Sequence, residues 1–201
     1  MKIIKKNKKL VKQKPNLEDY QKTYQQFKWQ DAEKELDWFE GKRLNAAYNA
    51  IDRNAINFRK NKVALYWEGS DGTKKNFTFA DLSRFSSRFA NVIKDLGVER
   101  GERVFFFLPR VPALYWGFLG VLKRGAIAGT LFAAFGPQAL WDRLDNSDAK
   151  ILVTTKELLK RVNKVRNKLP RLEKIILVDG ESTIDGVYNL NKLMSLSLIH
   201  I

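Results

Sequence analysis

The hydrophobic and polar positions between residues 62 and 97 predict a hairpin followed by an amphipathic helix. KVALYWEG and KKNFTF read as two strands, and the SDGT between them supplies the Asp and Gly that a tight turn favours. In the next segment, Thr78 can cap a helix whose third residue is Asp81, and Gly97 can end it. The apolar residues on one face of that helix are Leu82, Phe85, Phe89, Val92 and Ile93.

The rest of the body alternates short apolar runs with segments of helical length. The predicted strands are RVFFFLP, AIAGTLF, KILVTT and EKIILVD, of which the first two are expected to be buried. The predicted helices are PALYWGFLGVLKRG, GPQALWDRLDNS and KELLKRVNKVRNKLP, the last of them running to Pro170. This alternation is typical of βαβ units, so the sequence predicts an α/β fold with a parallel or mixed sheet and flanking helices.

Residues 16–61, ahead of this body, are polar and aromatic rather than regularly apolar. Leu17, Tyr20, Tyr24 and Phe27 recur at helical steps of three and four residues. The segment is therefore interpreted as an irregular, partly helical leader that lies on the body.

Charge is concentrated in two segments of a chain with 37 Lys and Arg, 22 Asp and Glu and a formal charge of +15. Residues 1–14 hold seven lysines and no acid, and residues 156–174 hold eight basic residues and two acids. A like-charged block with few apolar residues cannot bury enough surface to become ordered, so residues 1–15 are expected to form a disordered basic tail. The alternative is a nonspecific, salt-sensitive contact with nucleic acid or an anionic membrane.

Composition excludes several classes of chemistry. The chain has no cysteine and one histidine, which removes disulfides, thiolate metal sites, cysteine nucleophiles and nearly all imidazole mechanisms. The longest uncharged apolar stretch, Val111–Leu122, has 12 residues, whereas a bilayer span needs roughly 20. The N-terminal lysines are not followed by the apolar core of a secretory signal. We therefore expect a cytoplasmic protein.

The last residues, 196–201, read LSLIHI and contain the single histidine, His200. This string matches the translated end of a transposon adapter used in shotgun sequencing libraries, so it is interpreted as an adapter-derived artefact. The alternative is a frayed apolar tail. His200 is accordingly given no chemical role. The phosphate-loop, dinucleotide, zinc-protease and nucleophile-elbow motifs do not occur in the sequence, so motifs alone indicate no active site.

Longer stretches of the sequence are more informative than these short motifs. WFEGKRLNAAYNAIDRN (Trp38–Asn54) and the block from Phe77 to Thr155 resemble the opening of the AMP-forming acetyl-CoA synthetases, within the adenylate-forming ligase superfamily. The resemblance runs from about Tyr20 to Asp179. The block from Phe77 is shared in pattern by many acyl-CoA and aryl-CoA ligases, whereas LNAAYNAIDRN is more selective for the acetyl and propionyl enzymes.

The resemblance implies that residues 62–195 are the N-terminal part of a large ligase domain that is truncated before its catalytic motifs. The parent enzyme would convert acetate or another short carboxylate, ATP and CoA to acyl-CoA, AMP and pyrophosphate, with Mg²⁺. The residues for ATP, Mg²⁺ and catalysis would lie beyond this chain, so none is assigned here, and the chain alone is expected to be inactive. No specific nucleic acid and no membrane are expected as partners. The alternatives are another acyl-CoA or aryl-CoA ligase, or a small basic module that binds nucleic acid or membrane.

The resemblance places two candidate contacts with CoA. Phe132, Ala133, Ala134 and Phe135 stand where the family usually has Phe-Gly-Gly-Phe in a turn beside the CoA nucleotide. The alternative is that Phe132 and Phe135 are core aromatics.

Lys160 and Arg161 lie near a basic residue that meets the 3′-phosphate of CoA in relatives. The alternative is a solvated helix face above a buried stripe of Leu158, Leu159, Val162 and Val165. Truncation is also expected to expose parts of Phe105, Phe107, Leu131 and Phe132.

Overall fold

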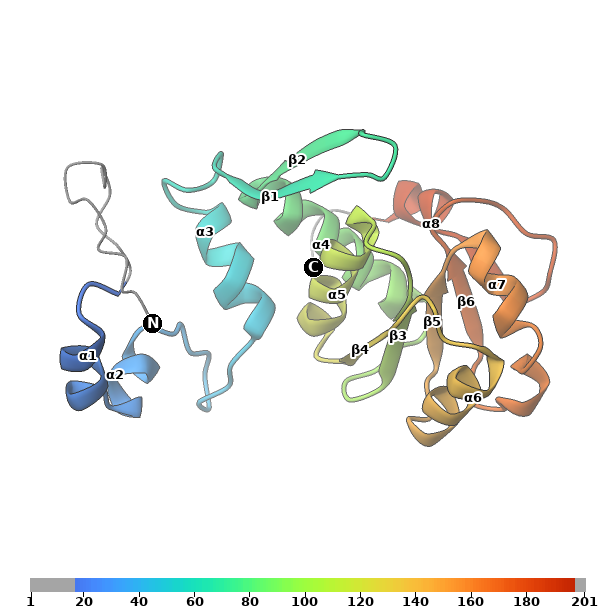
Figure 1. The fold of residues 1–201 in the computed structure, drawn as a ribbon, viewed down its shortest axis with the longest axis horizontal. Helices are drawn as coiled ribbons and strands as arrows, with labels where there is room; N and C mark the ends of the chain where they lie inside the picture. Colours follow the sequence, from blue (N-terminus) through green and yellow to red (C-terminus); the bar gives the residue numbers. More distant parts are fainter. Residues whose placement is uncertain (1–16, 198–201) are drawn as a thin grey trace, which may run out of the picture.

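The computed structural model describes residues 17–197, which form a leader, a hairpin and a five-stranded sheet with helices on both faces (Figure 1). The strands are β1 (Val63–Glu68), β2 (Lys74–Thr78), β3 (Arg103–Phe107), β4 (Ile127–Leu131), β5 (Ile151–Thr154), β6 (Lys174–Leu177) and β7 (Val187–Asn189). The α-helices are α1 (Tyr20–Gln26), α2 (Trp29–Lys34), α3 (Arg53–Ala55), α4 (Phe79–Asp95), α5 (Pro112–Arg124), α6 (Pro137–Asn146), α7 (Lys156–Val162) and α8 (Leu190–Leu196). A π-helical turn, η1, spans Tyr48–Asp52, and a 3-10 turn, η2, spans Arg166–Lys168.

The predicted α/β fold is confirmed. The sheet has the strand order β4-β3-β5-β6-β7, and every neighbouring pair is parallel. The strands predicted from the four apolar runs share this one sheet. Parallel neighbours require crossover connections, and α5, α6 and α7 follow successive strands as such connections do.

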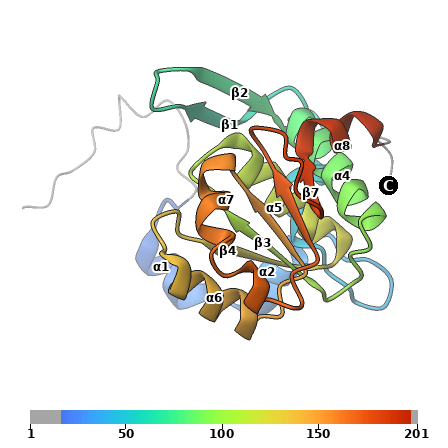
Figure 2. The ribbon, with the colours of Figure 1, turned by 90° about the vertical axis from the view of Figure 1, so that its right-hand side faces the viewer.

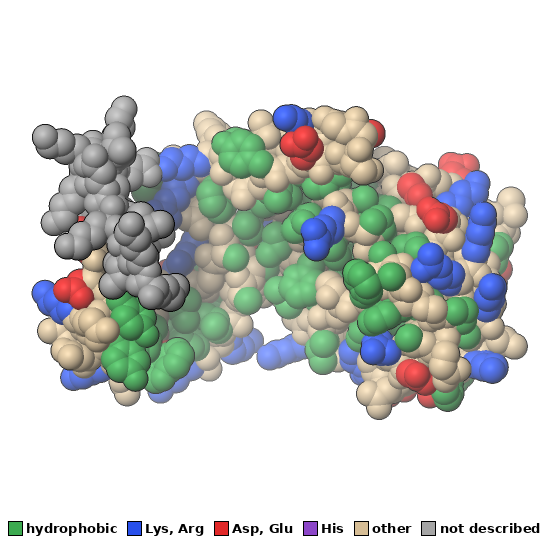
Figure 3. Space-filling view, viewed as in Figure 1, with side chains coloured by type: hydrophobic (Ala, Val, Ile, Leu, Met, Phe, Trp, Pro, Cys, Tyr) green, Lys and Arg blue, Asp and Glu red, His purple; other side chains and the backbone are tan. Residues whose placement is uncertain are grey.

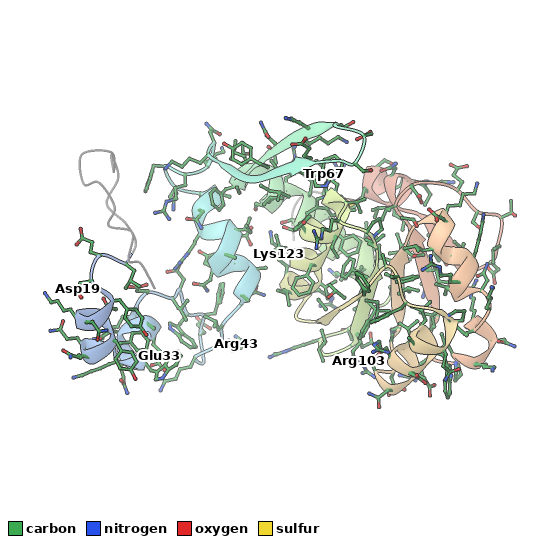
Figure 4. All side chains as sticks on the ribbon, viewed as in Figure 1. Asp19, Glu33, Arg43, Trp67, Arg103 and Lys123 are labelled. Carbon is green, nitrogen blue, oxygen red and sulfur yellow. The ribbon has the colours of Figure 1, made fainter. Side chains whose placement is uncertain are left out.

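The hairpin and the helix after it also form as predicted. Strands β1 and β2 pair antiparallel, and Gly72 in their turn has φ +79°, a left-handed conformation that glycine adopts without strain. The hairpin is tied to the body because Trp67 Nε1 donates a hydrogen bond of 2.7 Å to the Arg110 carbonyl (Figure 4). At the start of α4, the Thr78 hydroxyl accepts from the Asp81 amide at 3.1 Å, and Asp81 accepts from the Thr78 amide at 3.1 Å. The helix therefore begins with a capping box.

Alternate residues along the strands serve two apolar cores, one on each face of the sheet. On one face, Val104 and Phe106 of β3 pack with buried residues of α4, α5 and α8. On the other, Phe107 packs with Leu131 and with buried residues of α6 and α7. Figure 2 shows the sheet between these two layers of helices.

Three features differ from the sequence-based expectations. Helix α7 ends at Val162 rather than at Pro170, and the chain then turns so that Val165 and Leu169 join the second core. The run AIAGTLF forms an edge strand instead of a buried one, with Ile127 54% exposed. Strand β7 was not predicted, because VYN has only three residues and no apolar run.

The expected exposure is wrong for Phe107 and Leu131, which are buried because α6 and α7 cover that face of the sheet. Phe105 is half-buried, and Phe132 is exposed as expected.

The leader has a loosely packed first half and a closely packed second half. Helices α1 and α2 contain no buried residue and lie at the end of the molecule farthest from β6 in Figure 1. By contrast, Ala47 and Ile51 are buried, and Asn45 Nδ2 donates to the Leu122 carbonyl at 3.0 Å. Within residues 17–197, no helix is long and apolar enough to cross a membrane. The basic tail and His200 lie outside the described residues.

Candidate functional site

A cavity of about 730 Å³ opens where β3, β4, β5 and β6 end. Ligands of open α/β sheets bind outside the carboxyl ends of the strands, because loops there leave a crevice between neighbouring connections. The polar side chains that line the cavity are Lys75, Thr155, Glu157, Arg161 and Asp179. Apolar walls come from the loop after β3 and the start of α5, and the turn after β4 contributes Ala133. This edge of the sheet is the candidate site.

The structure brings together the two candidate segments that sequence reasoning had placed separately. Arg161 Nη1 donates to the Ala133 carbonyl at 2.7 Å and to the Phe135 carbonyl at 3.4 Å. The turn is closed by the Phe135 amide, which donates to the Phe132 carbonyl at 2.9 Å. Arg161 is half-buried, so one side of its guanidinium is already committed to the turn. It therefore fixes the position of the turn after β4 at the rim of the cavity.

Two aromatic rings mark this turn. Phe132 is 69% exposed, and its ring meets that of Phe135 edge to face with 5.9 Å between centroids. Arg143 from α6 stacks its guanidinium over the other ring, 4.3 Å from the Phe135 centroid. The alternative interpretation as core aromatics is wrong for Phe132, whereas Phe135 is partly buried against the second core. An exposed ring beside an ordered turn offers a flat surface to a ligand.

The remaining candidates differ in accessibility. Ala133 is half-buried and lines the cavity, whereas Ala134 is exposed. Lys160 is exposed on α7, and no ion pair joins it to another residue of the described range 17–197. The buried stripe beneath it, Leu158, Leu159, Val162 and Val165, is confirmed. Lys160 is thus the candidate whose charge is free to meet an anion.

Sequence reasoning missed the residues that organise the start of α7. Thr155 is its N-cap and accepts a hydrogen bond from the Leu158 amide at 3.2 Å. Asp179 Oδ1 accepts from the Lys156 amide at 2.7 Å and joins the end of β6 to the same helix. Their positions in the sequence could have identified them. Each follows the end of an apolar strand by one or two residues, and the carboxyl ends of these parallel strands meet at one edge of the sheet.

The described residues include no candidate metal centre. Among residues 17–197, no group of three or more His, Cys, Asp or Glu side chains could hold a metal ion. The cavity lining carries two basic side chains, Lys75 and Arg161, and two acidic ones, Glu157 and Asp179, with the turn after β4 on one side.

Comparison with known proteins decides the family. The family model for the AMP-binding enzymes matches residues 51–193, which include the hairpin, all five strands of the sheet and most of the helices around it. The chain belongs to the AMP-binding enzyme family. The family match covers every element that borders the candidate cavity.

Curated members of the AMP-binding enzyme family give a closer comparison. The acetyl-coenzyme A synthetase of Bacillus subtilis is 51% identical over 168 residues, which are 83% of this chain and 29% of that protein. The 3-hydroxypropionyl-coenzyme A synthetase of Sulfurisphaera tokodaii is 37% identical over 150 residues, 75% of this chain and 23% of that protein. The chain thus spans less than a third of the length of these relatives.

Solved structures agree with this assignment. A Brucella canis acyl-CoA synthetase superposes with a TM-score of 0.80 at 29% identity, covering 90% of this chain and 33% of its own. An anthranilate CoA ligase in complex with anthranoyl-AMP gives a TM-score of 0.69 at 28% identity, covering 77% of this chain and 29% of its own. The fold is therefore that of the large domain of the adenylate-forming ligases.

Proposed function

We propose that this chain is the N-terminal part of an AMP-forming acetyl-CoA synthetase, and that residues 62–195 belong to its large α/β domain. The observation that carries the proposal is the 51% identity to the Bacillus subtilis acetyl-coenzyme A synthetase. Residues 16–61 would be the leader of that domain, and the protein would act in the cytoplasm on a small carboxylate.

The proposed reaction has two steps, formation of acetyl-AMP and transfer of the acetyl group to CoA. An acetate oxygen attacks the α-phosphorus of ATP, and pyrophosphate leaves with the electron pair of the broken P–O bond. The CoA sulfur then attacks the carbonyl carbon of acetyl-AMP, AMP leaves, and the thiol proton passes to solvent or to a base. ATP and Mg²⁺ would be held by residues outside this chain, so the 201 residues alone would not catalyse either step.

The described residues would contribute to the binding of CoA. Lys160 is exposed and unpaired within 17–197, and an ammonium group suits a phosphate through a charge-assisted hydrogen bond. Phe132 would lie along the nucleotide, with Ala133 and Ala134 supplying the backbone of the turn. Arg161 would act as a positioning residue, since its hydrogen bonds hold the Ala133 and Phe135 carbonyls.

The identity of the carboxylate substrate is tested with the full-length protein, which extends past residue 195. AMP formation would be measured with ATP, CoA and one of three acids: acetate, benzoate, or 3-hydroxypropionate, the acid whose CoA ester appears in the name of a second relative. We expect a higher kcat/KM for acetate. A higher value for 3-hydroxypropionate or an aromatic acid would support the rival ligase class, and no acid-dependent AMP formation would contradict the proposal.

The CoA contact is tested by calorimetry on the same protein. Lys160→Gln removes an exposed cation of α7 that has no ion pair within 17–197, and Lys164→Gln removes another exposed lysine farther along the chain. We expect only Lys160→Gln to weaken CoA binding, by about tenfold, the size of one lost charge-assisted hydrogen bond. Equal effects of both variants would contradict the assignment.

A further inference from the structure

We propose that the recess between the leader and helices α4 and α5 is a second ligand site, and that it takes a nucleotide with two or three phosphates. The recess has a volume of about 960 Å³, within the range of small-molecule sites. Arg100 and Gly125 on its wall precede β3 and β4, so it opens at the amino ends of the strands. The candidate CoA cavity lies at the opposite, carboxyl ends. The inference is thus independent of the proposed function.

The recess is strongly cationic. Its wall carries six basic side chains and a single acidic one, Asp52. The basic residues are Arg43, Lys60, Arg84, Arg100, Lys123 and Arg124. Concave surfaces lined by one sign of charge concentrate ions of the opposite sign. Lys and Arg side chains gather at the hollow between leader and body in Figure 3.

Half of these cations are already neutralised. Lys123 Nζ pairs with Asp52 at 2.6 Å, Arg84 with Asp81 at 2.9 Å, and Arg124 with Glu99 at 2.9 Å. The described part of the chain provides no such carboxylate for the other three, Arg43, Lys60 and Arg100. Three unneutralised cations around one hollow match the charge of two or three phosphates.

Hydrogen bonds to the neighbouring backbone hold Arg43 at the rim of the recess. The amide of Arg43 donates to the Phe39 carbonyl at 3.3 Å, and the Phe39 amide donates back to the Arg43 carbonyl at 2.9 Å. Arg43 Nε donates to the Glu40 carbonyl at 2.9 Å. The stem of this arginine is therefore ordered, which leaves its terminal nitrogens to face a ligand. Figure 4 places Arg43 on the leader side of the recess and Lys123 on the body side.

An aromatic wall stands next to the cations. The rings of Phe39 and Tyr48 meet edge to face with 5.0 Å between centroids, and both line the recess. Leu44 and Ile56 add exposed apolar surface to the same wall. An inorganic anion would make no use of this wall, whereas a base could stack on it while its phosphates reach the arginines. A nucleotide combines both chemistries in one ligand of suitable size.

The test is a calorimetric titration of the 201-residue chain with ADP and, separately, with inorganic pyrophosphate, both without magnesium. We expect ADP to bind more tightly than pyrophosphate, and both to weaken as salt is raised. Arg100→Gln should weaken ADP binding by about tenfold or more, the size of a lost charge-assisted hydrogen bond. Phe39→Ala should weaken ADP but leave pyrophosphate unchanged. Hydrogen exchange on the unsubstituted chain should show ADP-dependent protection around residues 39–56.

Two control variants locate the site. Arg110→Gln removes an exposed arginine outside the recess and should change ADP binding by less than about twofold. Lys160→Gln, on α7 and outside the recess, should also leave ADP binding unchanged. The proposal is overturned if ADP does not bind, if Arg110→Gln acts as strongly as Arg100→Gln, or if only Lys160→Gln weakens binding. Pyrophosphate binding as tight as that of ADP would overturn the assignment to a nucleotide.

Discussion

Lys123 on α5 and Asp52 at the end of η1 form an ion pair of 2.6 Å that fastens the leader to the body. The Lys123 side chain is 5% exposed and that of Asp52 20%. Burial lowers the pKa of Lys123, and the hydrogen bond and charge of Asp52 partly restore it. The ammonium group also donates to the Ser83 carbonyl at 3.1 Å and the Ser87 hydroxyl at 3.0 Å. Every proton of this buried cation therefore has an acceptor.

The first prediction concerns Asp52. Asp52→Ala leaves the buried ammonium of Lys123 without its counter-charge, which costs about 3 kcal/mol of unfolding free energy when a buried pair is broken from one side. The pKa of Lys123 should fall further. Chemical denaturation checks the free energy. Asp31→Ala is the matched control, because its pair with Lys34 is exposed and worth under about 1 kcal/mol. Equal losses in the two variants would contradict the prediction.

The second prediction concerns pH and the capping box of α4. The side-chain hydrogen bond from Thr78 is the main cause that lowers the pKa of Asp81. A carboxyl whose pKa is lower in the folded state stabilises the protein above its unfolded pKa of about 3.9, and that stability is lost as pH falls through the folded value.

Thr78→Ala should therefore remove about 1 kcal/mol at pH 7, the usual cost of an N-cap, and less at pH 3. Denaturation at the two pH values measures both. Thr183→Ala, at an exposed threonine in the loop before β7, is the control for a threonine that caps no helix. A loss that grows toward acid pH would contradict the prediction.

The capping box of α4 shows which kind of feature the sequence could predict. Thr78 and Asp81 are three residues apart, and the capping box depends on that local spacing alone. The apolar runs of β3 and β5 are similarly local, because a strand buried on both faces must be apolar throughout. Local patterns of this kind were sufficient for the hairpin, for α4 and α5, and for most of the sheet.

Contacts between distant segments were not predictable in the same way. Arg161 and Ala133 are 28 residues apart, and only the packing of α7 beside the turn after β4 brings them together. The pattern KELLKRVNKVRNKLP is compatible with a longer helix, but the chain leaves the helix at Asn163, and Val165 and Leu169 reach the second core from the turns that follow. The candidate site therefore depended on resemblance for its residues and on tertiary structure for its geometry.

The third prediction concerns the close approach of α4 and α5. A Cβ added at Gly120 would lie 2.7 Å from the Ser86 carbonyl oxygen and 3.1 Å from Phe89 Cβ, so the two helices would have to separate. Overpacking of this kind costs typically 1 to 3 kcal/mol, and we expect Gly120→Ala to lose about 2 kcal/mol. Gly180→Ala is the control, because its added Cβ would meet only the flexible Lys156 side chain at 3.3 Å. Thermal unfolding of both variants should show a clear loss only for Gly120→Ala.

The last prediction concerns the apolar surface beside the edge strand β4. Ile127 is 54% exposed, and β4 pairs only with β3 among the described strands, so one edge of it is open. A hollow of about 390 Å³ next to it is lined almost wholly by apolar side chains, among them Leu65, Leu114 and Phe118. Open edges and apolar patches promote association between chains.

We therefore expect the 201-residue chain to bind the dye ANS and to self-associate, and to do so faster as salt screens the formal charge of +15. Ile127→Lys places a charge on the open edge and should reduce self-association in light scattering without lowering the midpoint of unfolding. Ile184→Lys makes the same change at an exposed loop residue away from β4 and should leave association unchanged. A monodisperse monomer that unfolds sharply and binds no dye would contradict the prediction, because the open edge and the hollow would then be harmless at this charge.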